Sequence, residues 1–380
     1  MKILQFGKFY PPDIGGIETA IYNITEGLNK KGIKCDVLCS NSKHEYKKEI
    51  IDRGSYKYTV YRTKNYGKVA STAITPQIIF KLKEIIDNYD IIHLHHPDPM
   101  ANFALFLVNP KKQRIVIHWH SDIIKQKFAL KFYRPLLDWM LKKADVIIGT
   151  SPKYIEESEQ LKKFKNKCIA IPLGIKKEDL EVDEEKIKEI KKKFKNKKII
   201  FSLGRLIYYK GFEYLIESSK YLPGNYVVII GGDGKMRKKY KKLITNNNLL
   251  NKVFLTGRIP QTHLGSYYKA CDLFCLPSVE KSEAFGLVMV EAMSFGRPIV
   301  ATKIKGSGVS WVNQHGITGL NIEPKNPKVL ADAIRFICEN PEIYIKMSKN
   351  ALKRFEEEFT IEKEILRILE IYNKLLEDKR

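Results

Sequence analysis

The sequence predicts an α/β protein made of two Rossmann-like domains with parallel sheets that face a central cleft. Short β-branched, apolar runs alternate with amphipathic helical stretches along the 380-residue chain, a pattern typical of parallel sheets covered by helices. A charged, helix-prone stretch at about 173–198 interrupts this alternation, and a new strand-first pattern begins at Lys198. Domains of this kind bind ligands at the carboxyl ends of their strands.

Short apolar runs predict the strands of an N-terminal domain over residues 1–172. They are Lys2–Phe6, Cys35–Cys39, Ile91–His95, Arg114–His118 and Val146–Thr150. Apolar residues at helical spacing predict the helices Ile17–Lys31, Thr75–Asn88 and Phe128–Lys143. The first apolar run is too short for a secretory leader, so we interpret it as a strand.

The same pattern predicts a C-terminal domain over residues 173–360. Its expected strands are Lys198–Leu203, Tyr226–Ile230, Val253–Thr256, Leu273–Leu276 and Pro298–Ala301. Its expected helices are Glu185–Phe194, Phe212–Tyr221, Lys235–Asn247, Leu287–Phe295 and Pro327–Glu339. A last helix, Ile361–Glu377, falls in the remaining segment 361–380.

The charge is the unusual feature of the composition. The chain has 67 Lys and Arg against 43 Asp and Glu, a formal net charge of +24. Chains with such a positive charge often bind polyanions, namely nucleic acid, anionic membranes or phosphorylated small molecules. A Lys-rich solvated surface explains the same net charge without any binding partner. The 44% of hydrophobic residues excludes disordered and collagen-like chains. No apolar run reaches the roughly 18 residues that span a bilayer, and six scattered cysteines are typical of free thiols in the cytoplasm.

Two glycine-bearing loops at predicted strand ends are candidate anion sites. Gly15 and Gly16 lie between the first strand and the first helix, where the backbone can approach a ligand and the helix offers free N–H groups. Arg205 and Lys210 lie in the loop after the first strand of the second half, and two fixed cations match a diphosphate. The alternative for the Gly15-Gly16 loop is a plain tight turn, and the alternative for Arg205 and Lys210 is ordinary solvated charge. Neither loop has the Gly-x-Gly-x-x-Gly spacing, which disfavours a nicotinamide cofactor.

The most informative segment contains two carboxylates, Glu283 and Glu291, around a predicted helix start. The loop and first helical residue between them are Ala284, Phe285, Gly286 and Leu287. Backbone N–H groups at such a helix start would point at an anion, and a carboxylate beside them can accept hydrogen bonds from hydroxyl groups. A capping or surface role for Glu291 is the alternative, but its apolar neighbours would require a partner if it were buried.

Histidines cluster at two predicted strand ends. His118 and His120 follow one strand, and His93, His95 and His96 end another. Three interpretations are open: a metal site, a histidine that hydrogen-bonds a sugar, and buried structural histidines. Because side chains alternate along a strand, His118 and His120 lie on the same face only if the strand continues through both. The chain has no Asp-x-Asp handle for a metal-bound diphosphate, no P-loop and no Gly-x-Ser-x-Gly elbow.

Taken together, these segments resemble the retaining glycosyltransferases of family 4, which have the GT-B fold and transfer sugars from nucleotide diphosphates. The resemblance covers essentially the whole chain, and its marks occur in order at predicted strand ends. They are Gly15-Gly16, Trp119-His120-Ser121-Asp122, Gly204-Arg205 with Lys210-Gly211, Gly231–Gly234, and Glu283 with Glu291. Gly174 stands where many relatives carry Asn, and both residues suit a positive φ.

The resemblance implies roles for the matched residues. Arg205 and Lys210 would bind the diphosphate in place of a metal, so neither metal nor cofactor is expected. We expect loss of either cation to impair transfer far more than folding. The other implied contacts are Gly15 and Gly16 near the phosphates, Arg258 and Ile259 at the base, Glu291 at the ribose, and Glu283 with Ala284, Phe285, Gly286, Leu287 and His120 at the donor sugar. The implied catalytic residues are His120, Glu283, Arg205 and Lys210.

The resemblance also implies partners. The donor would be a UDP- or GDP-linked sugar bound by the C-terminal domain, and the N-terminal domain would serve a glycan or lipid-linked acceptor at the cytoplasmic face, in polysaccharide or glycolipid synthesis. The last helix would cross back to the N-terminal domain. The alternatives are a GT-B enzyme that does not transfer, such as an epimerase, and, remotely, a nucleic-acid binder, for which no recognition module is found. The stretch Lys125–Lys143 mixes cations with aromatic residues, as in helices that lie on anionic membranes or pack on a core with a solvated Lys face.

Overall fold

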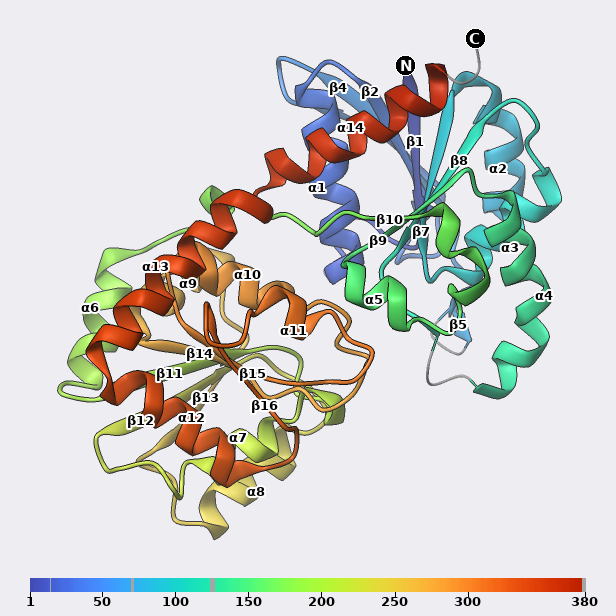
Figure 1. Ribbon diagram of the computed structural model, residues 1–380. Coiled ribbons are helices and arrows are strands. Elements are labelled where there is room, and N and C mark those ends of the chain that lie inside the picture. Colours follow the sequence, from blue (N-terminus) through green and yellow to red (C-terminus); the bar gives the residue numbers. More distant parts are fainter. Residues whose placement is uncertain (14, 70–71, 124–126, 378–380) are drawn as a thin grey trace. The chain divides into compact units, whose positions relative to one another are not determined.

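The computed structural model of the chain describes residues 1–13, 15–69, 72–123 and 127–377 (Figure 1). It divides into two compact units, one formed by Met1–Gly174 with Ile361–Arg380 and the other by Ile175–Thr360. Each unit is a predominantly parallel sheet covered by helices, so the predicted fold class is confirmed. No helix in these described ranges is long and apolar enough to cross a bilayer.

The first unit has an eight-stranded sheet in the order β10-β9-β8-β7-β1-β2-β4-β3, parallel except where β3 pairs with β4. Because β1 pairs with β2 on one side and β7 on the other, the strand order reverses there, and parallel α/β sheets bind ligands outside the carboxyl ends at such a switch point. The strands are β1 (Lys2–Gly7), β2 (Lys34–Ser40), β3 (Lys47–Asp52), β4 (Lys57–Thr63), β7 (Ile91–His96), β8 (Arg114–Trp119), β9 (Val146–Gly149) and β10 (Cys168–Ala170), with a separate hairpin of β5 (Lys68–Val69) and β6 (Thr72–Ala73).

The last helix of the chain completes the core of the first unit. Ile365 and Ile368 of this helix pack with Ile3 of β1 and Ile24 of α1, and Figure 1 shows the helix crossing beside α1. The helices of this unit are α1 (Gly16–Lys30), α2 (Gln77–Ile85), α3 (Pro99–Val108), α4 (Lys127–Lys143), α5 (Pro152–Glu157) and α14 (Ile361–Glu377), with 3-10 turns η1 (Ile86–Asn88) and η2 (Lys162–Lys167).

The second unit has a six-stranded, fully parallel sheet in the order β13-β12-β11-β14-β15-β16. Its switch point lies between β11 and β14. The strands are β11 (Lys198–Leu203), β12 (Tyr226–Gly231), β13 (Val253–Gly257), β14 (Leu273–Leu276), β15 (Ile299–Thr302) and β16 (Gly319–Ile322). The helices are α6 (Glu184–Lys193), α7 (Phe212–Ser218), α8 (Arg237–Asn246), α9 (Gln261–Ala270), α10 (Leu287–Ser294), α11 (Val309–Val312), α12 (Pro327–Glu339) and α13 (Pro341–Glu358), with 3-10 turns η3 (Lys177–Asp179) and η4 (Tyr208–Lys210).

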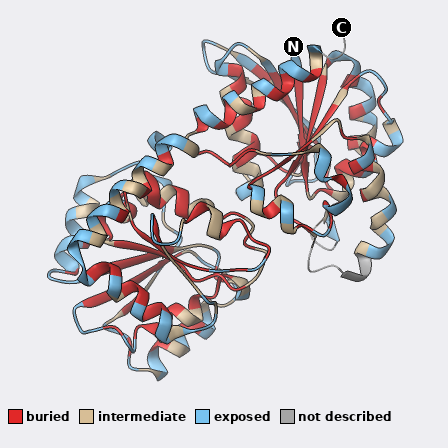
Figure 2. Ribbon diagram, viewed as in Figure 1, coloured by how far each residue is buried: buried red, intermediate tan, exposed pale blue. Residues whose placement is uncertain are grey.

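The central strands of both sheets are buried, whereas edge strands such as β3 and the outer helix faces are exposed (Figure 2). Every strand and helix predicted above is present, with ends within three residues of the prediction. Several elements have no counterpart among the predicted ones, and α3 is the most instructive of them. Phe106 and Leu107 of this helix are exposed, whereas Ala101 and Leu105 are buried. Apolar residues therefore lie on all faces of the helix, and the sequence shows no amphipathic period there. Its local signal is the N-cap Asp98, whose carboxylate accepts from two backbone N–H groups of the first turn.

Candidate active site

In the second unit, the loops after β11, β12 and β13 are joined at the carboxyl edge of the sheet. The Gly204 N–H donates to the Gly231 carbonyl at 3.1 Å, and the Leu206 N–H donates to the Asp233 carbonyl at 2.9 Å. Gly232 has a φ of +119°, and a Cβ there would lie 1.9 Å from the Gly204 oxygen. Only glycine permits this approach, so the glycine-rich segment after β12 shapes the loop that carries Arg205.

Lys210 and Glu283 form a buried ion pair at the switch point of the second unit. The Nζ atom of Lys210 lies 2.6 Å from Oε2 of Glu283, and the two side chains are 11% and 9% exposed. Ser278 donates to the same carboxylate oxygen at 2.8 Å, and the Ser307 hydroxyl donates to the Glu283 carbonyl. Burial is the largest single influence and lowers the pKa of Lys210, but the charge of Glu283, the neighbouring Tyr209 and the hydrogen bond to Glu283 together outweigh it, so the net pKa lies above its ordinary value. The ammonium is therefore charged and held in place.

Arg205 differs from Lys210 in being exposed. Within the described part of the chain its guanidinium has neither a hydrogen-bond acceptor nor an ion-pair partner. Its charge is close enough to lower the pKa of Lys210. The loop after β11 thus carries one fixed and one free cation toward the same region.

The start of α10 adds backbone donors. Gly286 is its N-cap in the left-handed conformation, with φ +80° and ψ +55°, and no side chain caps the helix. The N–H groups of Phe285, Gly286 and Leu287 have no acceptor among the described residues, as expected at a helix N-terminus. The Phe285 side chain is buried against Phe359, and the Ala284 carbonyl accepts from the Gly308 N–H at 2.8 Å. These two residues therefore offer only backbone N–H groups to a ligand.

Among the described residues, Glu291 has one hydrogen-bond partner, which leaves its other carboxylate oxygen free. The hydroxyl of the buried Tyr268 donates to Oε2 of Glu291 at 2.5 Å. Burial raises the pKa of Glu291 to about 7, although the hydrogen bond from Tyr268 and the charge of Lys210 oppose that shift. A carboxylate in this position can accept hydrogen bonds from ligand hydroxyls through Oε1.

Arg258 and Ile259 follow β13. Arg258 is exposed, and Ile259 is partly buried with its Cδ1 atom against Gly231, where a Cβ would lie 2.6 Å from it. The Gly232 N–H donates to the Gly257 carbonyl at 2.7 Å. The loop after β13 is therefore tied to the loop after β12.

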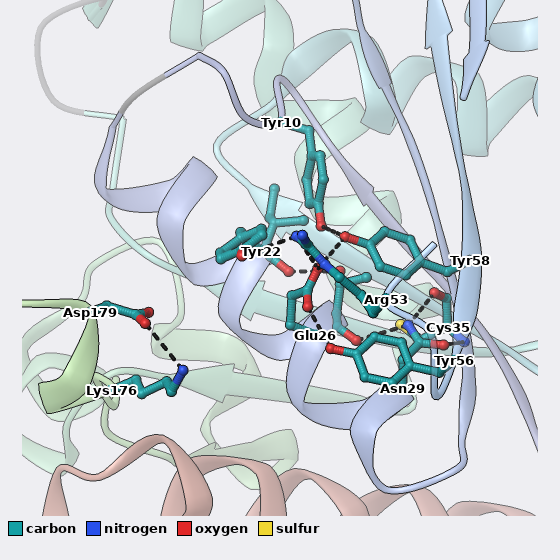
Figure 3. Close-up of polar contacts among 12 residues, drawn as sticks. Tyr10, Tyr22, Glu26, Asn29, Cys35, Arg53, Tyr56, Tyr58, Lys176 and Asp179 are labelled. Atoms are coloured by element: carbon teal, nitrogen blue, oxygen red, sulfur yellow. Dashed lines mark hydrogen bonds and ion pairs between the residues drawn. The ribbon is translucent and has the colours of Figure 1, made fainter. Parts of the chain in front are cut away.

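In the first unit, Gly15 and Gly16 lie on a loop anchored by a polar network (Figure 3). The Tyr10 hydroxyl lies 3.0 Å from that of Tyr58, which donates to Glu26 of α1 at 2.5 Å. Burial raises the pKa of Glu26, but hydrogen bonds from Tyr56, Tyr58 and Arg53 bring it below its usual value. The carboxylate is therefore charged and fixes the loop after β1 to α1.

The anchored loop presents the start of α1. Gly15 is the N-cap with an extended backbone, and no side chain caps the helix. The N–H groups of Gly16 and Ile17 lack an acceptor in the described ranges. A Cβ on Gly16 would meet no atom of the described residues within 4 Å, so among these residues the backbone lies open to an approaching group.

The histidines gather on one face of the first sheet, at its switch point. The rings of His118 and His120 stack with centroids 4.3 Å apart and planes within 3°, so both lie on the same face although β8 ends at Trp119. His93 and His95 of β7 join the stack, while His96 stacks on Trp119 instead. Burial lowers the pKa of each of these histidines, so their rings are neutral.

Three of these rings bring nitrogen atoms together as a metal site would require. One nitrogen each from His95, His118 and His120 lies within 4.8 Å of the others. However, His95 Nδ1 and His120 Nε2 already share a hydrogen bond at 2.9 Å, and the His118 ring is stacked nearly parallel to both. In-plane lone pairs of stacked rings do not converge on one point, so joint ligation would require a ring to turn.

Comparisons with known proteins agree with the architecture described above. A family model for group 1 glycosyl transferases matches residues 183–354, and a model for glycosyltransferase family 4 matches residues 14–179. The chain is 32% identical over 385 residues to the O-antigen chain mannosyltransferase C of Escherichia coli, with both chains fully covered. The chain belongs to the family 4 glycosyltransferases. It is also 30% identical to a D-rhamnosyltransferase of Pseudomonas aeruginosa, over 95% of this chain and 92% of that one.

Solved structures share the fold of this glycosyltransferase. Sucrose-phosphate synthase from Thermosynechococcus elongatus superposes with a TM-score of 0.80 at 20% identity, covering all of both chains. Anabaena HepE in complex with UDP-glucose superposes with a TM-score of 0.75 at 20% identity, covering 98% of this chain and all of that one. These likenesses establish the GT-B fold.

Several site residues of this glycosyltransferase were missed in the sequence. Ser278 holds Glu283 from within the same loop, whereas Tyr268 holds Glu291 only after folding brings α9 beside α10. Gln5 carries a signal that could have been used. It is a polar residue within the apolar run of β1 and is fully buried, and a buried amide requires hydrogen-bond partners.

Proposed function

We propose that this glycosyltransferase moves a sugar from a nucleotide-diphosphate donor to a glycan or lipid-linked acceptor, with retention of anomeric configuration and without a metal ion. The observation that carries the proposal is the set of positive groups at the β11–β14 switch point. Arg205 is exposed without a described partner, Lys210 is buried and charged, and the start of α10 offers free N–H groups. Together these groups fit a diphosphate.

The remaining donor contacts follow from the chemistry of each side chain. Glu291 accepts hydrogen bonds from the ribose hydroxyls through its free oxygen. Arg258 and Ile259 meet the base through backbone groups. Gly15 and Gly16 lie near the phosphates, since the α1 N-terminus there is uncapped and open.

The sugar itself is held by carboxylate, amide and imidazole groups. Glu283 and the N–H groups of residues 284–287 bind its hydroxyls, and His120 accepts a further hydrogen bond. Because Lys210 and Ser278 occupy Oε2 of Glu283, its other oxygen is the one that faces the sugar.

Charge neutralisation on the leaving diphosphate lowers the barrier in this proposal. The bond between the anomeric carbon and the diphosphate oxygen breaks while the acceptor hydroxyl attacks from the same face, and the departing oxygen takes the hydroxyl proton. Fixed cations and preorganised N–H groups stabilise the charge that develops there. This route needs no carboxylate nucleophile on the opposite face, unlike that of retaining glycosidases.

Product analysis tests the reaction. The purified enzyme is incubated with UDP-, GDP- and dTDP-linked sugars, with and without a lipid-linked or glycan acceptor, and the anomeric configuration of the product is assigned by NMR. We expect transfer with retention and undiminished rates in EDTA. Inversion, loss of activity in EDTA, or epimerised donor without transfer would each contradict a part of the proposal.

The relatives narrow the biological setting. The named relatives at 30–32% identity are an O-antigen mannosyltransferase and a D-rhamnosyltransferase, and HepE is solved with UDP-glucose. These names support a role in cell-surface polysaccharide or glycolipid synthesis, and we propose that the enzyme acts at the cytoplasmic face of the membrane. Both UDP- and GDP-linked donors belong in the screen.

Exposed aromatic side chains on α3 and α4 favour a peripheral contact with an anionic membrane. Phe132 is 76% exposed on α4, and Phe103 and Phe106 are 41% and 42% exposed on α3, which packs beside it. The basic residues Lys131 and Lys142 are exposed on α4. Of the stretch that suggested this contact, 125–126 lie outside the described residues. Cations with interfacial aromatic groups bind anionic lipid surfaces.

Vesicle co-sedimentation tests this contact. We expect binding to vesicles with anionic lipid, weaker binding to neutral ones, and a loss in Phe132→Ser. Phe336→Ser is the matched control, because Phe336 is 47% exposed on α12 of the other unit. Equal binding to neutral and anionic vesicles would refute an electrostatic contact.

A further inference from the structure

A chain of buried polar side chains beneath His120 has no role in the function proposed above. Gln5, His95 and Tyr372 are all fully buried in the first unit. Burial of polar groups costs free energy unless they are hydrogen-bonded, and these groups bond to one another across three elements. Their arrangement therefore requires a reason beyond packing.

The hydrogen bonds run in one line from β1 to His120. Oε1 of Gln5 lies 2.7 Å from Nε2 of His95, and Nδ1 of His95 lies 2.9 Å from Nε2 of His120. The strand order places β1, β7 and β8 side by side. The His95 and His120 ring planes lie within 14°, with centroids 5.2 Å apart, so their nitrogens meet nearly in plane.

Tyr372 sets the direction of this chain. Its hydroxyl oxygen accepts from Nε2 of Gln5 at 3.5 Å and lies 2.5 Å from Nδ1 of His93. The Gln5 amide nitrogen is thereby directed toward Tyr372 of α14, and the amide oxygen toward His95. An amide oxygen only accepts hydrogen bonds.

The tautomers of both histidines follow from that direction. A neutral imidazole has one N–H donor and one bare acceptor nitrogen. His95 must donate from Nε2 to Gln5, so its Nδ1 is bare and accepts from Nε2–H of His120. The Nδ1 atom of His120 is consequently also bare, and it has no donor among the described residues.

We propose that Gln5 and His95 are positioning residues that hold His120 as the Nε2–H tautomer, so that Nδ1 accepts a hydrogen bond from a hydroxyl of the donor sugar. This inference rests on the proposed function, in which His120 contacts the sugar. His120 is 7% exposed, and a nearly buried acceptor that loses its donor is costly. The enzyme therefore selects donors that carry a hydroxyl at this position and discriminates against the corresponding deoxy sugars.

His118 provides a matched control for packing. Its ring lies in the same stack, and it is fully buried. Neither of its nitrogens has a hydrogen-bond partner in the described structure. It shares the surroundings of His95 but not the hydrogen-bond chain.

The first measurement needs no substrate. Long-range ¹H–¹⁵N spectra of histidine-labelled full-length enzyme distinguish Nε2–H from Nδ1–H for His120, assigned by its loss in His120→Ala. We expect Nε2–H in the wild type, in His95→Gln and in His118→Leu. A wild-type Nδ1–H tautomer would overturn the proposal, whatever the variants do.

The second measurement compares kcat and KM for the donor, with thermal unfolding as the check on folding. We expect His95→Leu to lose on the order of 10- to 100-fold in kcat/KM, mainly through the KM of the donor. His95→Gln keeps an acceptor for His120 and a donor for Gln5 and should stay within about threefold of the wild type, as should His118→Leu. Equal losses in His95→Leu and His118→Leu would show a packing effect and refute the role of the hydrogen-bond chain. A wild type that transfers no sugar refutes the proposed function instead, and the spectra still decide the tautomer.

Discussion

Nζ of Lys210 lies 2.6 Å from Oε2 of Glu283, 73 residues further along the chain, and both side chains are buried. This contact joins the loop after β11 to the loop after β14 across the switch point of the second sheet. The pair therefore has a structural role in addition to its place in the anion site.

Lys210→Ala is expected to destabilise the enzyme by about 3–5 kcal/mol, because it leaves an uncompensated buried carboxylate. The structure thus revises the expectation from the sequence that loss of this cation would affect transfer far more than folding. Urea unfolding measures the effect. The double variant Lys210→Met with Glu283→Gln removes both charges and should regain much of the stability. Equal unfolding free energies for the single and double variants would contradict this account.

Arg205→Ala should behave in the opposite way. The side chain is exposed and has no described partner, so the unfolding free energy should change by no more than about 0.5 kcal/mol. Turnover should fall on the order of 100-fold, since a cation aimed at the leaving group is lost. Lys220→Ala, an exposed cation of the same unit, is the control and should leave turnover unchanged. Similar turnover in both variants would remove Arg205 from the site.

The sequence predicts the elements and the strand-end motifs well because both are local. Apolar period and strand length identify β11 and β14, and in a parallel sheet the carboxyl ends of neighbouring strands share one edge. Arg205, Glu283 and Glu291 could therefore be named from their positions alone.

The partners of these residues could not be named in the same way. Lys210 meets Glu283 only because β11 and β14 are neighbours, and this adjacency depends on the sheet order rather than on any local pattern. The hydrogen bond from the Gly174 N–H to Glu364 spans 190 residues. The polarity of a single buried residue such as Gln5 indicates that a partner exists, but not which one.

The pH dependence of donor binding should report on Glu291. Burial raises its pKa to about 7, so the side chain is protonated below that pH and ionised above it. An ionised carboxylate accepts ribose hydroxyls more strongly, and the KM of the donor should therefore rise as the pH falls below about 7. The dependence should be absent in Glu291→Gln, measured by initial rates between pH 5.5 and 8.5, a range of about 1.5 units on either side of that pKa. A KM that rises equally in the variant would assign the titration to another group.

Glu364 should make the enzyme less stable as the pH rises. It is 1% exposed on α14 and accepts from the Gly174 N–H at 2.7 Å. Burial raises its pKa to about 8, although the Gly174 hydrogen bond and the charge of Arg367 oppose the shift. As the pH rises, Glu364 ionises first in the unfolded state. Its contribution to the free energy of unfolding is therefore fully present below the unfolded pKa of about 4.5 and is lost as the pH rises through about 8.

The change of unfolding free energy with pH can be measured by chemical unfolding between pH 5 and 8, the window that those two pKa values set. Glu364 should lower the free energy of unfolding by about 1.4 kcal/mol per pH unit in this window. Glu364→Gln keeps the acceptor for Gly174 and cannot ionise, so it should flatten the slope. Glu362→Gln, an exposed neighbour on the same helix, should leave the slope unchanged. Parallel curves for the wild type and Glu364→Gln would show that another group is responsible.

Gly16→Ala tests whether a phosphate approaches the start of α1. A Cβ there would meet no atom within 4 Å, and alanine is favourable in a helix, so the melting temperature should be unchanged or slightly higher. The added methyl group would still occupy the space into which a bound phosphate must come, so the KM of the donor should rise by on the order of tenfold or more, equivalent to about 1.4 kcal/mol. Gly224→Ala is the matched control, because its Cβ also meets no atom within 4 Å and it lies in a loop before β12, away from the proposed phosphate contacts. If both variants bind the donor as the wild type does, the open backbone at Gly16 has no part in donor binding.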